Sequence, residues 1–170
     1  MYRAVFQAGE LDQSQPVTVL YQNGDLYQGL LQRIHRHCDK GRLQYANGDL
    51  YEGGWSDGKR EGIGCLKTAR GVYNGVFANG FMATGTFTDL KGSVYSSGEG
   101  GRFTQEGLLN GPGKIAFGNG DTFSGNFRDG KRSGPGIMVY LMAGSGVGGE
   151  HGGRYEGQWK RDLREGQGRM

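Results

Sequence analysis

Aromatic residues and glycines alternate with polar residues in short stretches along most of this 170-residue chain. In the stretch from Asn47 to Gly64, which reads NGDLYEGGWSDGKREGIG, the residues Tyr51, Gly53 and Trp55 lie two positions apart. Side chains two positions apart lie on the same face of a β-strand. The pattern therefore predicts a strand with one aromatic, buried face and one polar, solvent-exposed face.

The same offsets recur along the chain. The pattern that starts at Tyr51 starts again at Phe123 and Tyr155, and in part at Tyr73. Self-similarity at fixed offsets is typical of a repeat architecture. The predicted aromatic anchors are Tyr27, Tyr51, Trp55, Tyr73, Phe77, Tyr95, Phe123, Phe127, Tyr155 and Trp159. The predicted repeat glycines are Gly53, Gly58, Gly62, Gly64, Gly75, Gly125, Gly130, Gly134, Gly136, Gly157, Gly166 and Gly168.

Two kinds of turn sequence separate these stretches. Asp57-Gly58 and Asp129-Gly130 lie between alternating runs, and such dipeptides are a strong hairpin signal. Asn-Gly-Asp triplets at 23–25, 47–49 and 119–121 then join one hairpin to the next. The chain is predicted to be all-β, an elongated, twisted antiparallel meander of about six to seven stacked hairpins in a single ribbon with one aromatic face.

Glycine inside a strand usually marks a close approach by another group. Gly53 leaves space between two rings, and we expect a ring from the next repeat to fill it. Gly62 and Gly64 are expected to share a face of the second strand and to clear the same kind of space.

The runs YEGGWSDGKREGIG, FSGNFRDGKRSGPG and YEGQWKRDLREGQG resemble the MORN repeat, a family of β-hairpins that stack into an elongated, curved ribbon. Weaker forms of the pattern extend over residues 21 to 168. In that family the repeats serve as scaffolds and adaptors, so the resemblance implies a non-enzymatic role. Residues 1–16 are interpreted as an N-terminal arm or cap and residues 17–170 as the repeat ribbon, with a glycine-rich insertion at 141–153.

Composition and charge limit the classes of protein to which this chain can belong. The chain holds 36 glycines and 3 prolines, but their periodic placement argues against disorder. A net charge of +3 is well short of what nucleic-acid-binding proteins carry, so no nucleic-acid partner is expected. Two cysteines without a secretory segment favour a reducing, intracellular location. No apolar run is long enough to span a membrane.

Candidate catalytic chemistry is sparse. The glycine pattern at 144–149 lacks the following helix that a dinucleotide site needs, so we interpret it as part of a flexible insertion. His35, His37, Cys38 and Asp39 have metal-ligand side chains, but alternation places Cys38 on the opposite face from the histidines. We favour a polar turn there over a metal site. The sequence predicts no enzyme activity, no cofactor and no metal.

Basic residues recur just past the hairpin turns. The candidate partner-binding basic edge consists of Lys59, Arg60, Lys131, Arg132, Lys160, Arg161 and Arg164. Stacked repeats are expected to align these residues as a stripe. A solvated edge, a contact with an acidic protein surface and a contact with anionic lipid all remain open interpretations.

The resemblance to the MORN repeat leads to a functional hypothesis. We expect a structural scaffold or adaptor that binds other proteins of a larger assembly, with a partner helix or extended segment along the ribbon face. Because members of that family occur in cilia, flagella and other cytoskeletal assemblies, the resemblance implies an intracellular axonemal or cytoskeletal complex of a cilium or flagellum. Open strand edges also allow end-to-end self-association. The alternative is a phosphoinositide-binding membrane tether, and a more remote one is an accessory subunit of an enzyme complex.

Overall fold

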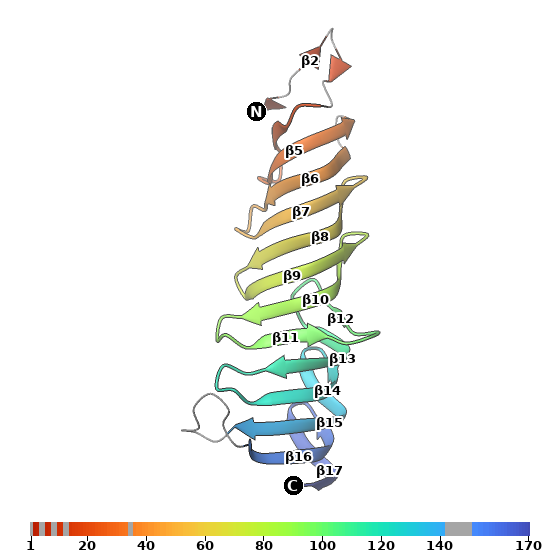
Figure 1. Ribbon diagram of the computed structural model, residues 1–170. Coiled ribbons are helices and arrows are strands. Elements are labelled where there is room, and N and C mark those ends of the chain that lie inside the picture. The colour runs from red at the N-terminus through yellow and green to blue at the C-terminus, as the bar shows by residue number, and fades with distance from the viewer. Residues whose placement is uncertain (1, 4–5, 8–9, 12–13, 34–35, 142–150) are drawn as a thin grey trace. The chain divides into compact units, whose positions relative to one another are not determined.

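The computed structural model describes the chain except for residues 1, 4–5, 8–9, 12–13, 34–35 and 142–150 (Figure 1). All regular elements among the described residues are β-strands, as the alternating pattern predicts. None of the described residues forms a helix of the length and apolarity needed to cross a membrane. The chain divides into two compact units, residues Met1–Phe81 and Met82–Met170.

Unit 1 is an antiparallel meander in which β4 to β8 each pair with the next strand along the chain, while β1 pairs with β4 and β2 pairs with β3. Its strands are β1 (Tyr2–Arg3), β2 (Phe6–Gln7), β3 (Glu10–Leu11), β4 (Val17–Leu20), β5 (Leu26–Arg33), β6 (Arg36–Gln44), β7 (Leu50–Ser56), β8 (Lys59–Thr68) and β9 (Gly71–Ala78). Part of the predicted arm, 1–16, thus joins the sheet through β1. Its role as an arm or cap stays a prediction.

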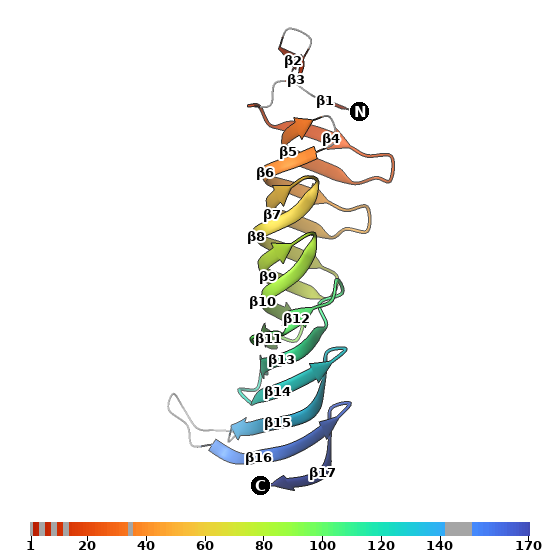
Figure 2. The same cartoon turned by 90° about the vertical axis from the view of Figure 1, so that its right-hand side faces the viewer.

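Unit 2, taken by itself, has the same plan in the order β10-β11-β13-β14-β15-β16-β17, with β12 pairing with β13 outside this path (Figure 2). Its strands are β10 (Phe81–Asp89), β11 (Val94–Ser97), β12 (Arg102–Phe103), β13 (Leu109–Ala116), β14 (Thr122–Arg128), β15 (Lys131–Leu141), β16 (His151–Lys160) and β17 (Leu163–Arg169). The predicted all-β antiparallel meander is confirmed within each unit. Leu141 pairs with His151, so the ends of the predicted insertion lie in strands and its centre lies outside the described residues.

The strand pairs contain a register shift at a fixed place in the repeat. Gly53 pairs with Gly64 and Trp55 pairs with Arg60, so β8 has three residues between these two pairs where β7 has only Gly54. Gly62 lies inside this irregularity with a φ of 71°, in the left-handed region that glycine adopts most readily. A Cβ added at Gly62 would meet nothing within 4 Å. The prediction that Gly62 clears space as Gly64 does is therefore wrong, because Gly62 serves the backbone conformation instead.

Gly53 and Gly64 make room for the anchor ring of their own hairpin. A Cβ on either glycine would lie 2.6 Å from the Tyr51 hydroxyl oxygen. The prediction that a ring from the next repeat fills this space is therefore wrong: the Tyr51 side chain lies along the hairpin and covers both glycines. The same arrangement recurs where Tyr27 covers Gly29 and Gly41, where Phe123 covers Gly125 and Gly136, and where Tyr155 covers Gly157 and Gly168.

The next repeat contributes a ring that packs edge-on against the anchor. The ring centroid of Phe77 is 4.9 Å from that of Tyr51 and 5.2 Å from that of Tyr73. Trp55 bridges Tyr27 and Tyr51 in the same way, at 5.6 and 5.1 Å. Edge-to-face pairs of this kind add about 0.5–1.5 kcal/mol each beyond the burial of their area. The rings therefore form a continuous buried ladder that joins successive hairpins within unit 1.

Unit 2 repeats this ladder at Phe123, Trp159 and Tyr155, with centroid distances of 5.3 and 5.4 Å. Tyr95 differs from the other predicted anchors, which are all buried, because it is only half-buried and its hydroxyl donates to Asp89 at 3.4 Å. The fully buried side chain in this part of unit 2 is Leu109, which lies over Gly113.

Candidate functional site

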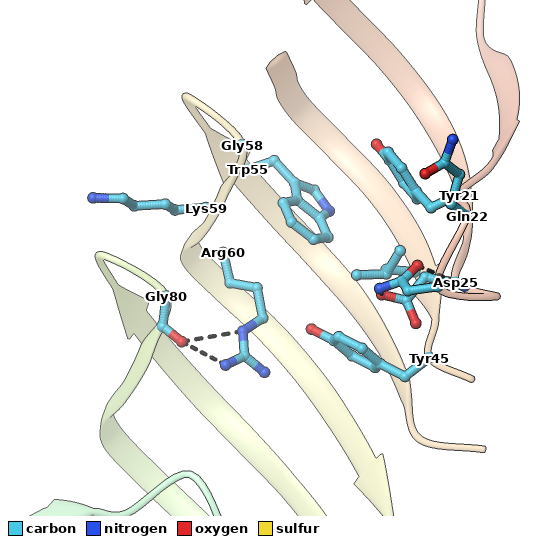
Figure 3. Close-up of a pocket in the computed structure, with 11 residues that line it drawn as sticks. Tyr21, Gln22, Asp25, Tyr45, Trp55, Gly58, Lys59, Arg60 and Gly80 are labelled. Carbon is cyan, nitrogen blue, oxygen red and sulfur yellow. Dashed lines mark hydrogen bonds between the residues drawn. The ribbon is translucent and has the colours of Figure 1, made fainter. Parts of the chain in front are cut away.

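A groove with a volume of about 690 Å³ lies in unit 1, between the turns that follow β4 and β6 and the hairpin turn between β7 and β8 (Figure 3). It combines aromatic, apolar and charged side chains. The residues that line it are Tyr21, Gln22, Asn23, Asp25, Leu43, Tyr45, Trp55, Gly58, Lys59, Arg60 and Gly80.

Tyr21 and Tyr45 form one wall of the groove because each opens an Asn-Gly-Asp turn. The Tyr45 N–H donates to the Asp49 carbonyl at 2.9 Å, and the Tyr45 carbonyl accepts from the Gly48 N–H at 2.9 Å. The Asn47 side chain donates to Asp49 at 3.0 Å and so stiffens the turn. Both tyrosine side chains remain half-buried, with ring surface facing the groove (Figure 3).

The turns of neighbouring repeats are also bonded to one another. The Asp25 carboxylate accepts a hydrogen bond from the Ala46 N–H at 2.9 Å, which ties the first Asn-Gly-Asp turn to the second. In unit 2, Asp121 accepts from the Leu141 N–H at 2.8 Å. The tie between turns fixes the spacing of Tyr21 and Tyr45 along the groove wall.

Arg60 lies opposite these tyrosines and is held on several sides. Its Nε and Nη2 donate to the Gly80 carbonyl at 3.1 and 2.5 Å. Its Cζ lies 5.1 Å from the ring centroid of Phe77 and 5.7 Å from that of Tyr51, within the range of cation–π attraction. Lys59, by contrast, extends away from the groove (Figure 3). Arg60 is therefore a fixed part of the groove.

The charges of the groove are mixed. The Asp25 carboxylate lies on the side of the Asn-Gly-Asp turns, and the cations Lys59 and Arg60 lie on the side of the hairpin turns (Figure 3). Burial raises the pKa of Tyr45, against an opposing effect of Arg60, and Asp25 and Asp49 raise it further. The Tyr45 hydroxyl therefore stays protonated at neutral pH and is a hydrogen-bond donor.

A related cavity of about 420 Å³ occurs in unit 2, where Phe117 takes the place of Tyr21 and Tyr45. Arg132 repeats the role of Arg60: its Cζ lies 4.2 Å from the ring centroid of Trp159 and its Nη2 donates to the Asp162 carbonyl at 3.0 Å. Arg132 also forms an ion pair with the Asp162 carboxylate at 3.1 Å. This ion pair makes the cavity in unit 2 chemically different from the groove in unit 1.

The structure separates the predicted basic edge into two groups. Arg60, Arg132 and Arg164 stack on aromatic rings. Lys59, Lys131, Lys160 and Arg161 are exposed. Within unit 2, the exposed residues Lys131, Lys160 and Arg161 line a further cavity together with Arg128, Asp129 and Ser133.

Sequence reasoning missed Tyr21, Tyr45 and Arg128. The signal for the two tyrosines was present, because each lies six residues before an anchor, as Phe117 lies before Phe123. Arg128 lies opposite Lys131 across a hairpin turn that the sequence did identify.

The described residues offer contact surfaces rather than a metal site. No group of three or more histidine, cysteine or acidic side chains within the described part of the chain is placed to hold a metal ion. The cluster at His35, His37, Cys38 and Asp39 and the glycine pattern at 144–149 lie outside the residues whose side chains the structure describes. Cys65 is a free thiol.

Comparisons with known proteins identify the repeat. The family model "MORN repeat" matches residues 51–72, 105–122, 123–140 and 155–170. No curated protein matches the sequence of the chain. Among solved structures, the chain is similar to the TCP domain of SAS-4 (dCPAP) from Drosophila melanogaster, solved in complex with a proline-rich motif of Ana2 (dSTIL). That similarity has a TM-score of 0.42 and 14% sequence identity over 88% of this chain and 86% of the other.

Proposed function

Because this chain belongs to the MORN-repeat proteins, we propose that it is a non-enzymatic scaffold that binds other proteins of a larger assembly through the aromatic groove of unit 1. The observation that carries the proposal is the pair of half-buried tyrosines, Tyr21 and Tyr45, which face a groove rather than the buried ring ladder. Tyrosine and arginine at a concave surface are the residue types that dominate protein-binding energy.

The groove is preorganised for binding. Tyr45 is held by its turn, and Arg60 is held by the Gly80 carbonyl and two rings. A partner therefore meets a fixed turn backbone and an Arg60 side chain that loses little conformational freedom on binding, and this lowers the entropic cost of the complex. The occupant that fits is a helix or extended segment with apolar side chains for the rings and a basic group near Asp25.

The finer proposal concerns the assembly. MORN-repeat proteins include scaffolds of cilia, flagella and other cytoskeletal structures, and we place this chain in an intracellular axonemal or cytoskeletal complex. The support is the resemblance to the family together with a surface suited to holding a partner.

A photo-crosslinking amino acid at Tyr45 tests the groove directly. In cells that carry a tagged copy, we expect crosslinks to one defined protein that remains with the cytoskeleton after extraction with non-ionic detergent. The matched control is the same crosslinker at Asn74, which is exposed on β9 beside the buried Tyr73. Equal crosslinking from both positions would exclude the groove as the binding surface, and release of the protein with the membrane fraction would contradict the cytoskeletal assignment.

A further inference from the structure

A second surface of different chemistry lies in unit 2. Four exposed cationic side chains surround a cavity of about 440 Å³, whose lining residues are Arg128, Asp129, Lys131, Ser133, Lys160 and Arg161. We propose that this basic cluster is a docking site for an acidic segment of a partner protein. The inference rests on the proposed function as a protein-binding scaffold and adds a second contact with its own chemistry.

The hairpin turns bring these cations together. Arg128 and Lys131 flank the Asp129-Gly130 turn and face each other as cross-strand partners. Like charges placed directly opposite each other destabilise a sheet. Lys160 and Arg161 come from the turn of the next hairpin, where Arg161 has a φ of 50°. The fold thus holds like charges close together against their mutual repulsion.

The fold itself makes little use of the cluster. Within the described part of the chain, Lys160 pairs with Glu165 at 3.0 Å, whereas Arg128, Lys131 and Arg161 form no ion pair and no side-chain hydrogen bond. Arg132, the sequence neighbour of Lys131, is by contrast engaged by Asp162 and by the Trp159 ring. The unengaged charges remain available to a ligand.

The cluster is not a by-product of the repeat. In unit 1 the positions equivalent to Arg128 and Lys131 are Ser56 and Lys59, and those equivalent to Lys160 and Arg161 are Ala78 and Asn79. Only one of the four is cationic there. Unit 1 instead has Glu61 nearby, whose carboxylate accepts from the Asn79 N–H at 2.8 Å. The four-cation arrangement of the last two hairpins of unit 2 is therefore not repeated at these positions of unit 1.

The remaining two lining residues favour a peptide as the occupant. Acidic side chains satisfy the cations, and the backbone N–H groups of the same peptide offer donors to the Asp129 carboxylate. A fully ionised phosphate group has no donor for Asp129 and would meet it as a like charge. The Ser133 hydroxyl donates or accepts and so suits a peptide backbone as well. Charge complementarity thus points to an acidic peptide segment.

The test uses the full chain and a short fluorescein-labelled peptide rich in glutamate, followed by fluorescence anisotropy at about 0.15 M salt, where long-range attraction is screened. The test variant carries Arg128→Gln, Lys131→Gln and Arg161→Gln. We expect it to bind the peptide about tenfold more weakly than the parent chain, from the summed effect of three exposed ion pairs. A thermal melt establishes that the variant remains folded.

The control variant removes the same number of charges elsewhere in unit 2, through Lys91→Gln, Arg102→Gln and Lys114→Gln, all at exposed positions. We expect its affinity for the peptide to equal that of the parent. An equal loss in both variants would show attraction to net charge alone and would overturn the proposal, as would absence of peptide binding to the parent chain.

Lipid vesicles and inorganic phosphate test whether the basic cluster binds a ligand other than a peptide. Vesicles of phosphatidylcholine and phosphatidylserine that bind the parent but not the test variant, without peptide binding, would reassign the cluster to a membrane surface. Displacement of the peptide by an equal concentration of inorganic phosphate would reassign it to free phosphate. Crosslinking at Tyr45 separates this inference from the proposed function: groove crosslinks without peptide binding would overturn only the inference, and peptide binding without groove crosslinks would overturn only the groove.

Discussion

At the scale of single residues, the glycines of one hairpin perform two different tasks. Gly64 lacks a side chain because the Tyr51 ring lies over it, and Gly62 lacks one because its backbone adopts a left-handed conformation. Tyr51 is fully buried and packs edge-on against Trp55 and Phe77, so its ring has no free space to move into. The two glycines should therefore respond differently to the same substitution.

Substitution by asparagine can separate the role of Gly62 in the backbone from the role of Gly64 in ring packing. Asparagine tolerates the left-handed region better than other residues with a side chain. We expect Gly62→Asn to lower the free energy of unfolding by less than about 1 kcal/mol, since nothing lies within 4 Å of the added Cβ. Gly64→Asn should cost about 1–3 kcal/mol or more, as an overpacking substitution. Urea unfolding measures both values, and equal losses would contradict the assignment.

The anchor tyrosines also combine burial with a hydrogen bond. The Tyr51 hydroxyl donates to the Gly54 carbonyl at 2.8 Å, and the Tyr73 hydroxyl donates to the Val76 carbonyl at 3.1 Å. Burial raises the pKa of each of these hydroxyls from 10.0 to about 12. Between these two values the unfolded chain loses protons that the folded chain retains, so the free energy of unfolding falls as the pH rises.

This linkage predicts alkaline instability with a defined window. The contribution of the buried hydroxyls is fully present below pH 10 and is lost progressively towards pH 12. Tyr73→Phe should cost about 1 kcal/mol at neutral pH, through loss of the bond to the Val76 carbonyl, and should make the alkaline fall less steep. Urea titrations at a series of pH values test both effects, and an unchanged slope in the variant would refute the link to Tyr73.

At the scale of elements, arginine connects one hairpin to the turn of the next. Arg60 on β8 holds the Gly80 carbonyl in the turn after β9, and Arg132 on β15 holds the Asp162 carbonyl in the turn after β16. Each guanidinium also covers rings from two repeats. Each arginine thus covers aromatic rings of the ladder with its guanidinium group. Its hydrogen bond also fixes the position of the following turn.

Lysine keeps the charge but cannot reproduce the planar, two-donor contact with Gly80. We expect Arg60→Lys to lower the free energy of unfolding by about 1–2 kcal/mol, because it loses one hydrogen bond and most of the stacking. Lys59→Gln is the matched control and should change stability by less than about 0.5 kcal/mol, since Lys59 is exposed. Similar effects of the two substitutions in chemical unfolding would show that Arg60 is not a structural clamp.

At the scale of the whole molecule, one repeat plan supports two surfaces of different chemistry. The ring ladder and the stacked arginines occur in both units, so these features belong to the scaffold. The surfaces arise at positions that the scaffold leaves free to vary: aromatic groove residues in unit 1 and the basic cluster in unit 2. Differences between repeats, rather than the shared pattern, therefore carry the proposed binding specificity.

The sequence by itself determined the all-β meander and the repeat family. Strand alternation and turn dipeptides such as Asp57-Gly58 act over a few residues, so they can be read without knowledge of distant contacts. The positions of the turns and most of the buried rings follow from the same local pattern. Tyr95 shows the limit, because its repeat is interrupted and Leu109 is the fully buried residue nearby.

Only the tertiary structure decided which side chain each glycine accommodates and what each basic residue does. Lys59 and Arg60 are neighbours of equal charge, yet Arg60 is fixed by Gly80 and Phe77, which lie about twenty residues further along the chain. The basic cluster likewise depends on two hairpin turns lying side by side across more than thirty residues, between Arg128 and Arg161. A repeat pattern shows that residues recur, but the direction and partners of their side chains depend on packing between repeats.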